Sequence, residues 1–373
     1  MSGGNDVIIS DSIVNDFVIK EGFSDILLEW YKKSRRILPW REDPSPYHVW
    51  LSEIMLQQTR VEAVRDHYLR FVGRLPDIRS LAEAPEDVYL KLWEGLGYYS
   101  RARNLHRAAR IITEEYGGEM PGTSSALIKL PGIGPYTAAA IASIAFGEAS
   151  PAVDGNLLRI FARLTRFEGN IRTPDALRAA TSFYRERMPE AAAAESSENP
   201  CGDFNQALMD LGAVVCLPNA KPDCEGCPLA KHCRAHREMS GMESSLPVRP
   251  GPKERKTEYL TVFLIRCGER TAVVKRPAGG LLAGLYEFPN AKGELDDESA
   301  VKWLRDHFVE PIRILRTIDA EHVFTHKIWK MRGYEVIADP FTEKDIPYLM
   351  ADREEILTRY SIPSAFGAYL DML

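Results

Sequence analysis

The most constraining feature of this sequence is a group of four cysteines within residues 216–233. No secretion signal precedes them, so the clustering indicates metal ligation rather than a disulfide framework. Four thiolates this close in sequence can hold either a zinc ion or a [4Fe-4S] cluster, and a pair separated by two residues suits both. We therefore expect a loop closed around a metal, on the frame Cys216-x7-Cys224-x2-Cys227-x5-Cys233.

A change of residue pattern near residue 238 divides the chain. With 373 residues the chain is long for one core. Apolar residues recur at helical spacing before this point, and runs of β-branched residues follow a segment rich in Ser, Pro, Gly and charge. The pattern predicts a multidomain chain with an N-terminal extension (1–21), an all-α domain (22–237), a linker (238–256) and an α+β domain (257–373).

The composition excludes several classes of protein. It is 45% hydrophobic and 27% charged, which is typical of a soluble globular protein. The N-terminal segment is acidic and lacks a basic n-region, and no run of about 18 apolar residues occurs. We therefore expect neither a membrane protein nor an exported one.

The net charge of -6 does not by itself favour a nucleic-acid partner. Basic residues nevertheless gather locally, and such patches can bind phosphate on a chain that is acidic overall. Solvated helix faces are at least as common an explanation for any one cluster, so charge alone decides nothing. The two clusters are Lys32, Lys33, Arg35, Arg36 and Arg41, and Arg101, Arg103, Arg107 and Arg110.

A carboxylate and two amides interrupt an apolar stripe that we expect to run along one helix from Trp50 to Tyr68, in the stretch "SEIMLQQT". Apolar neighbours would raise the pKa of Glu53 and keep it protonated near neutrality, which is the state that a general acid needs. If the segment stood alone, a Glu at the edge of the stripe reaching water, or capping a nearby helix, would be the better interpretation.

Asp154 is a second candidate carboxylate, in "PAVDGNLLRIFARL". In isolation it is best explained as the N-cap of the helix that follows. Cleavage of a glycosidic bond, however, needs one protonated carboxyl at the leaving group and one ionised carboxylate beneath the developing cation. Asp154 and Glu53 together could supply this pair.

A glycine-rich turn precedes an Ala-rich helix in "LPGIGPYTAAAIASIAFG". We expect Pro135 at the first helical position and Gly147 at the end of the helix. The turn would expose backbone amides at a helix N-terminus, which is a site for phosphate. A plain connection between two helices is the alternative, although the full string is more specific than a Gly-x-Gly turn alone.

Taken together, the motifs make this chain resemble the adenine DNA glycosylases of the MutY type, within the helix-hairpin-helix superfamily that includes endonuclease III. The resemblance runs from about residue 24 to the end. It rests on "LPWR" (38–41), "WLSEIMLQQTRV" (50–61), "GLGYYSRARNL" (95–105), "LPGIGPYTA" (130–138), "VDGN" (153–156), "FNQALMDLGAVVC" (204–216) and the cysteine frame.

The resemblance implies an enzyme that flips adenine out of a pair with 8-oxoguanine and hydrolyses its N-glycosidic bond. Glu53 would protonate the base at N7 and help to activate water, and Asp154 would stabilise the sugar cation or a covalent sugar adduct. Tyr136 and Asn156 would support that pair. Gln58 and Tyr98 would wedge into the duplex, and the adenine pocket would be lined by Arg36, Trp40, Arg41, Leu56 and Gln206. The hairpin contact with the DNA backbone would come from Gly132, Ile133 and Gly134.

The residue at position 136 separates members of the superfamily. Bifunctional members carry a Lys in this slot and use its amine to form a Schiff base that leads to strand cleavage. Tyr136 cannot do so. The resemblance therefore implies a monofunctional glycosylase that leaves an abasic site.

The C-terminal segment resembles the Nudix-like domain of the same family, through "GGLLAGLYEFPN" (279–290) and "HVFTHKIW" (322–329). No Glu-rich helix of the Nudix type follows the first motif, so we do not expect nucleotide hydrolysis. The loop that reads 8-oxoguanine in the family, Phe-Ser-His, would here be Phe324, Thr325 and His326.

The resemblance also selects the cofactor and the partner. The family usually has six residues between its first two cysteine ligands and this chain has seven, which a Pro-containing loop can accommodate, so the implied cofactor is a [4Fe-4S] cluster. The implied partner is duplex DNA with A:8-oxoguanine or A:G mispairs, bound by a monomer. The location would be the cytoplasm, at the nucleoid, in a prokaryote, and the nucleus or mitochondrion in a eukaryote. Two rival hypotheses are a related glycosylase of other specificity and a damage-binding module without catalysis.

Overall fold

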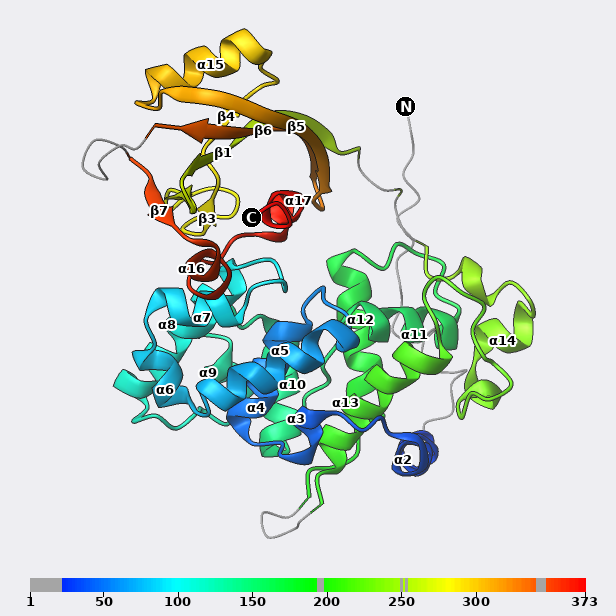
Figure 1. Ribbon diagram of the computed structural model, residues 1–373. Coiled ribbons are helices and arrows are strands. Elements are labelled where there is room, and N and C mark those ends of the chain that lie inside the picture. The colour runs from blue at the N-terminus through cyan, green and yellow to red at the C-terminus, as the bar shows by residue number, and fades with distance from the viewer. Residues whose placement is uncertain (1–21, 193–197, 249–250, 252–253, 340–346) are drawn as a thin grey trace, which may run out of the picture. The chain divides into compact units, whose positions relative to one another are not determined.

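The computed structural model spans residues 1–373 and describes all of them except 1–21, 193–197, 249–250, 252–253 and 340–346 (Figure 1). The predicted N-terminal extension and parts of the predicted linker lie outside the described residues. The chain forms two compact units. Among the described residues, the first contains 22–72, 77–79, 107–192, 198–248 and 251, and the second contains 73–76, 80–106, 254–339 and 347–373.

The described part of the chain before residue 239 is helical, as its apolar spacing predicts. The helices are α2 (Phe23–Ser34), α3 (Pro39–Glu42), α4 (Pro46–Leu56), α5 (Val61–Arg74), α6 (Ile78–Glu83), α7 (Glu86–Leu92), α8 (Ser100–Glu115), α9 (Ser124–Leu127), α10 (Pro135–Phe146), α11 (Gly155–Thr165), α12 (Pro174–Arg185), α13 (Pro200–Asp210) and α14 (Arg234–Glu238). A π-helical turn, Leu211–Val215, extends α13, and short 3-10 turns lie at Ala230–His232 and Glu243–Ser245.

The expected single helix from Trp50 to Tyr68 is wrong. The helix ends at Leu56 and a new one begins at Val61, with Gln57 as the C-cap of α4. Gln58 adopts a left-handed backbone with a φ of 59°, which no α-helix can continue through. The two glutamines therefore occupy a turn between helices and do not fill a stripe position.

Helix α10 is the buried centre of the first unit. It begins at Pro135 and ends at Gly147, whose φ of 72° gives a left-handed C-cap, and both positions agree with the sequence prediction. Its small side chains from Thr137 to Ile144 are buried, and the helix packs against α4 and α13. This packing brings the C-terminal end of α4 to the first turn of α10.

Helix α11 joins this centre to a second aromatic core. Its apolar side chains pack with α2, α12 and α13, where Phe161, Phe183 and Phe204 are buried, and the cysteine segment lies against the same core. The face of α11 turned toward the cysteines carries two buried arginines, Arg159 and Arg163. The helix therefore links the first unit's core to the cysteine loop.

The second unit contains a mixed sheet of order β3-β2-β1-β6-β5, in which β1 and β6 are parallel. Its strands are β1 (Lys256–Cys267), β2 (Arg270–Lys275), β3 (Tyr286–Glu287), β4 (Asn290–Lys292), β5 (Pro311–Val323), β6 (Lys327–Ala338) and β7 (Leu349–Ala351), where β4 pairs with β1 and β7 pairs with β2. One core forms under α15 (Asp297–Asp306), and another forms with α16 (Arg353–Thr358), a 3-10 turn at Ser364–Phe366, and α17 (Gly367–Leu370). Figure 1 shows α15 and α17 on opposite faces of the sheet.

Within the described residues, no helix combines the length and apolarity needed to span a membrane.

Candidate active site

A cavity of about 190 Å³ in the first unit collects most of the predicted site residues. Its walls come from α3, α4, α10, α11 and α13. All four predicted catalytic residues and all five predicted pocket residues line it: Glu53, Tyr136, Asp154, Asn156, Arg36, Trp40, Arg41, Leu56 and Gln206. Segments up to about 170 residues apart in the sequence, from Arg36 to Gln206, therefore meet around one cavity.

Glu53 is buried in the wall of this cavity, with 6% of its surface exposed. The Tyr136 hydroxyl donates a hydrogen bond of 2.8 Å to its Oε2. Burial raises the pKa of Glu53 to about 7, with Asp154 adding to the rise while the Tyr136 hydrogen bond and Arg41 oppose it. A substantial fraction of Glu53 is thus protonated near neutrality, in agreement with the expectation from its apolar neighbours.

Asp154 is the N-cap of α11, as the structural interpretation of the sequence expected. Its Oδ1 accepts backbone hydrogen bonds from Asn156 and Leu157, each 2.8 Å long, and its Oδ2 accepts one of 2.9 Å from the Asn156 side chain. The surrounding protein raises the pKa of Asp154, while these donors hold the rise back. Asp154 therefore both caps α11 and lines the cavity.

A chain of hydrogen bonds connects Asp154 to the cysteine segment. The Asn156 side chain donates a hydrogen bond to Asp154 and accepts one of 3.0 Å from Nη1 of Arg159. Nε of Arg159 donates a hydrogen bond of 2.8 Å to the carbonyl of Cys216. Arg159 also donates 2.7 Å to the carbonyl of Gly212 in the π-helical turn. Sequence reasoning missed Arg159, because an arginine in an amphipathic helix looks like an exposed residue until its burial is known.

Arg36 and Arg41 share one acceptor, Asp210, that the sequence did not reveal. Asp210 is fully buried at the end of α13 and lies between the two guanidinium groups. Burial works against its ionisation, but the hydrogen bonds and charges of Arg41 and Arg36 outweigh burial and lower the pKa of Asp210. The cavity wall thus contains two cations held by one buried anion.

The two predicted wedge residues, Gln58 and Tyr98, do not line the cavity. Both are exposed and both have left-handed backbones, with φ values of 59° and 46°. Left-handed backbone costs a residue other than glycine about 1 kcal/mol or more, and such strain is often found at functional sites. Gln57, beside Gln58, donates 3.2 Å to Thr137 and anchors the turn to α10.

The predicted hairpin has the backbone that its glycines allow. Gly132 has a φ of 79°, Ile133 is buried, and Gly134 is the N-cap of α10. A glycine N-cap offers no side-chain acceptor for the first amides of the helix. These N–H groups at the positive end of α10 can therefore serve an anion from outside the chain.

The predicted reading loop lies between β5 and β6 in the second unit. The Phe324 amide donates 2.8 Å to the Lys327 carbonyl, which closes a tight turn with Thr325 and His326 exposed at its tip. The Phe324 ring packs edge-on against Trp329 at 4.8 Å. Within the same unit the Thr325 hydroxyl contacts the Tyr98 hydroxyl.

The four clustered cysteines line one cavity in the first unit, as their spacing predicts. Burial raises the pKa of Cys227 to about 12 and that of Cys233 to about 11, with neighbouring cysteines adding to each rise, so a cationic centre is needed to hold them as thiolates. Nη1 of Arg163 donates 3.1 Å to Cys216 Sγ, and its Nη2 is buried without an acceptor among the described residues. A thiolate-bound metal centre of net negative charge fits this orphaned donor.

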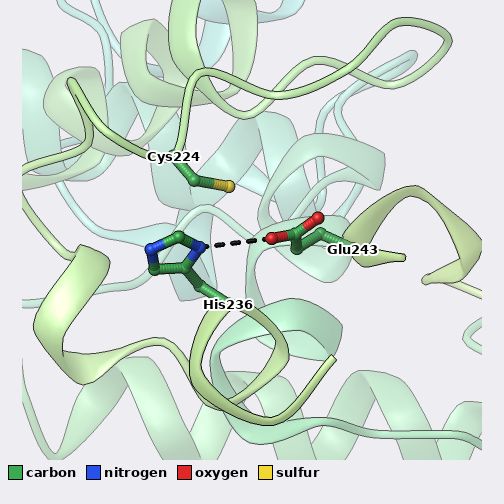
Figure 2. Close-up of side chains that lie close together, drawn as sticks. All are labelled: Cys224, His236 and Glu243. Carbon is green, nitrogen blue, oxygen red and sulfur yellow. Dashed lines mark hydrogen bonds and ion pairs between the residues drawn. The ribbon is translucent and has the colours of Figure 1, made fainter. Parts of the chain in front are cut away.

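Figure 2 shows a further pair of polar side chains beside Cys224. Nδ1 of His236 lies 3.2 Å from Oε1 of Glu243, and the candidate ligand atoms of all three residues lie within 4.8 Å of one another. Because Cys224 belongs to the four-cysteine frame, this pair lies next to the same metal site. Neither residue was singled out from the sequence, since both lie beyond the last cysteine.

Comparisons with known proteins identify relatives of this chain. Residues 51–186 match the HhH-GPD superfamily of base excision DNA repair proteins, and residues 261–372 match the NUDIX domain. The chain is 35% identical to the adenine DNA glycosylase of Mus musculus, covering 88% of this chain and 73% of that protein. It is 40% identical to the adenine DNA glycosylase of Buchnera aphidicola subsp. Baizongia pistaciae, covering 84% of each.

A solved structure of a thermostable thymine-DNA glycosylase is similar to part of this chain. It is 28% identical with a TM-score of 0.51, and the match covers 59% of this chain and 97% of that chain.

The raised pKa of Glu53 predicts a pH-dependent gain in stability for Glu53→Gln. The folded protein binds this proton more tightly than the unfolded chain, so the wild type loses stability as pH rises from about 4.5 to about 7. The full loss is on the order of 3 kcal/mol, and a neutral amide avoids it. Denaturant unfolding of both proteins at about pH 5 and about pH 8 should show that the free energy of unfolding of the variant, relative to that of the wild type, is larger at the higher pH.

Glu114, exposed on α8, provides the control for this measurement. Glu114→Gln should show no such gain, because that side chain remains in water. An equal difference between Glu53→Gln and wild type at both pH values would show that Glu53 is ionised in the folded protein.

Proposed function

The chain belongs to the family of adenine DNA glycosylases, and from this premise we propose that it releases adenine mispaired with 8-oxoguanine or guanine from duplex DNA, leaving an abasic site. The observation that carries the proposal is the pairing of Glu53 and Asp154 on one cavity in contrasting environments. Glu53 is buried beside a phenol, whereas Asp154 accepts three hydrogen bonds. These environments suit one acid and one carboxylate.

In the proposed mechanism Glu53 gives its proton to N7 of adenine, and the electrons of the glycosidic bond pass to the base. The base then leaves as neutral adenine, and the cation that develops at C1′ is stabilised by the ionised carboxylate of Asp154. Water adds to C1′ and returns a proton to Glu53. Tyr136 orients Glu53 through its 2.8 Å hydrogen bond, and Asn156 orients Asp154 through one of 2.9 Å.

Tyr136 supports a monofunctional reaction. Burial, Glu53 and Asp154 raise the pKa of its phenol well above the ordinary value, so it stays neutral. A phenol has no amine with which to form a Schiff base, and in the described residues no lysine lines the cavity. The expected product is therefore an abasic site in an intact strand.

A base stacked in a duplex cannot reach the buried Glu53, so the substrate adenine must be flipped into the cavity. Gln58 and Tyr98 are the residues proposed to fill the duplex where the base leaves. The open amides at the start of α10, with Gly132, Ile133 and Gly134, are proposed to hold a backbone phosphate. The exposed turn of Phe324, Thr325 and His326 is proposed to read 8-oxoguanine opposite the adenine.

The four-cysteine cavity is proposed to hold a [4Fe-4S] cluster through Cys216, Cys224, Cys227 and Cys233. When bound, the cluster would supply a rigid anionic centre that fixes the loop. Arg163 would donate a hydrogen bond to a thiolate ligand of the cluster. Arg159 would connect the Cys216 backbone to Asn156, because it donates hydrogen bonds to both. Neither arginine takes part in bond cleavage.

Single-turnover release of adenine from duplexes with A opposite 8-oxoguanine tests the proposed reaction. We expect wild-type activity, and a loss of at least about 100-fold in both Glu53→Gln and Asp154→Asn, because each variant removes one carboxyl from the pair. Binding of the same duplexes by both variants serves as the folding control. Persistent base release by Glu53→Gln would contradict the acid role, and binding without any release by the wild type would favour the damage-binding hypothesis.

Metal analysis and absorption spectroscopy of the purified protein test the proposed cluster. We expect a yellow-brown protein with about four iron and four sulfide per chain, because a [4Fe-4S] cluster has that stoichiometry. Cys224→Ser should lose most of the colour, while Cys201→Ser, outside the cavity, should keep it. A colourless protein with about one zinc per chain would contradict the proposal.

The hydroxyl of Thr325 should matter for reading 8-oxoguanine. Thr325→Ala should reduce the preference for A opposite 8-oxoguanine over A opposite G by about fivefold, the value of one hydrogen bond of about 1 kcal/mol, while Thr325→Ser should preserve it. The ratio of single-turnover rates on the two duplexes measures this. Thr317→Ala, at an exposed site on β5, is the control and should leave the ratio unchanged.

A further inference from the structure

Asp210 is a fully buried carboxylate whose two oxygens are saturated by arginines. Oδ1 accepts hydrogen bonds of 2.8 Å from Nε of Arg36 and of 2.9 Å from Nη2 of Arg41. It also lies 2.7 Å from Nη2 of Arg36. Oδ2 accepts 2.8 Å from Nη1 of Arg41 and 3.1 Å from the Arg36 backbone amide. Such paired, charge-assisted bonds fix both the position and the orientation of a guanidinium.

Both arginines belong to the wall of the cavity that holds Glu53. Their side chains are 27% and 13% exposed, so little water is available to screen them. Arg41 also donates 3.2 Å to the Arg36 carbonyl, which ties α3 to the segment before it. A lone guanidinium in this place would favour the ionised form of Glu53.

We propose that Asp210 is a positioning residue that fixes Arg36 and Arg41 in the cavity wall and offsets part of their positive charge, so that Glu53 keeps the proton it donates. The inference rests on the proposed function of Glu53. It assigns the α13 carboxylate a role in the reaction although Asp210 does not itself line the cavity.

The charged and titratable groups around Glu53 come from each element packed against it. Tyr136 faces it from α10, Asp154 from the start of α11, and Arg41 from α3. Arg41 in turn faces Tyr31 of α2 as well as Asp210. Of these groups Arg41 is the cation that favours ionised Glu53, and Asp210 is the anion that pairs with it.

The pH dependence of single-turnover adenine release tests this inference. Rates should fall on the alkaline side as Glu53 loses its proton. In Asp210→Asn the alkaline limb of the pH–rate profile, where the rate falls, should move to lower pH by about one unit. The rate should then be about tenfold lower than that of the wild type above about pH 8, with a smaller change below about pH 6. A merely structural role would lower the rate by the same factor at every pH.

Arg41→Gln provides a second test, and as a single variant it leaves Asp210 unchanged. Removal of this cation should move the alkaline limb to higher pH, and Asp210→Asn combined with Arg41→Gln should return the limb toward the wild-type position. Asp210→Glu, which keeps the charge, should leave the limb closer to wild type than Asp210→Asn does.

Glu335 of β6 is a matched control in the second unit. It is also a buried carboxylate between two arginines, at 2.9 Å from Arg266 and 2.6 Å from Arg316. Glu335→Gln should lower stability without moving the alkaline limb. An unmoved limb in both Asp210→Asn and Arg41→Gln, or an equal movement in Glu335→Gln, would overturn the inference, whereas wild-type protein that releases no adenine would overturn the proposed function itself.

Discussion

Burial of the Glu53 carboxyl against the first turn of α10 is the interaction on which the rest of the site depends. It requires α4 and α10 to pack closely, which the small buried side chains of α10 permit. The same contact brings the Tyr136 hydroxyl to 2.8 Å from Glu53 and Gln57 to 3.2 Å from Thr137. One helix pair thus sets the acid, its hydrogen-bond partner and the turn that carries Gln58.

A second constraint comes from the buried arginines of α11. Asn156, Arg159 and Arg163 are spaced by three and four residues and so share one face of the helix. Arg159 donates hydrogen bonds to Asn156 and to carbonyls of the turn that ends at Cys216. Arg163 contacts a cysteine sulfur and retains one buried nitrogen without an acceptor among the described residues. A negatively charged centre between the cysteines would give this buried nitrogen an acceptor.

Much of the architecture could be predicted from the sequence, because hydrophobic spacing and the Gly and Pro breaks are local signals. The family resemblance and the two-part fold are confirmed. Asp210 and Arg159 could not be found, because their roles depend on partners 174 and 57 residues away. The break at Gln58 was missed because a left-handed residue other than glycine leaves no signature in sequence.

The positions of the two carboxyls along their helices explain why they can hold different protonation states in one cavity. Asp154 lies at the N-terminus of α11, where backbone amides and the positive end of the helix dipole stabilise a carboxylate. Glu53 lies in the last turn of α4, where the dipole opposes ionisation and a phenol is its hydrogen-bond donor. The N-cap role of Asp154 is therefore part of its chemistry, since the bonds that start the helix favour its ionised form against the burial that raises its pKa.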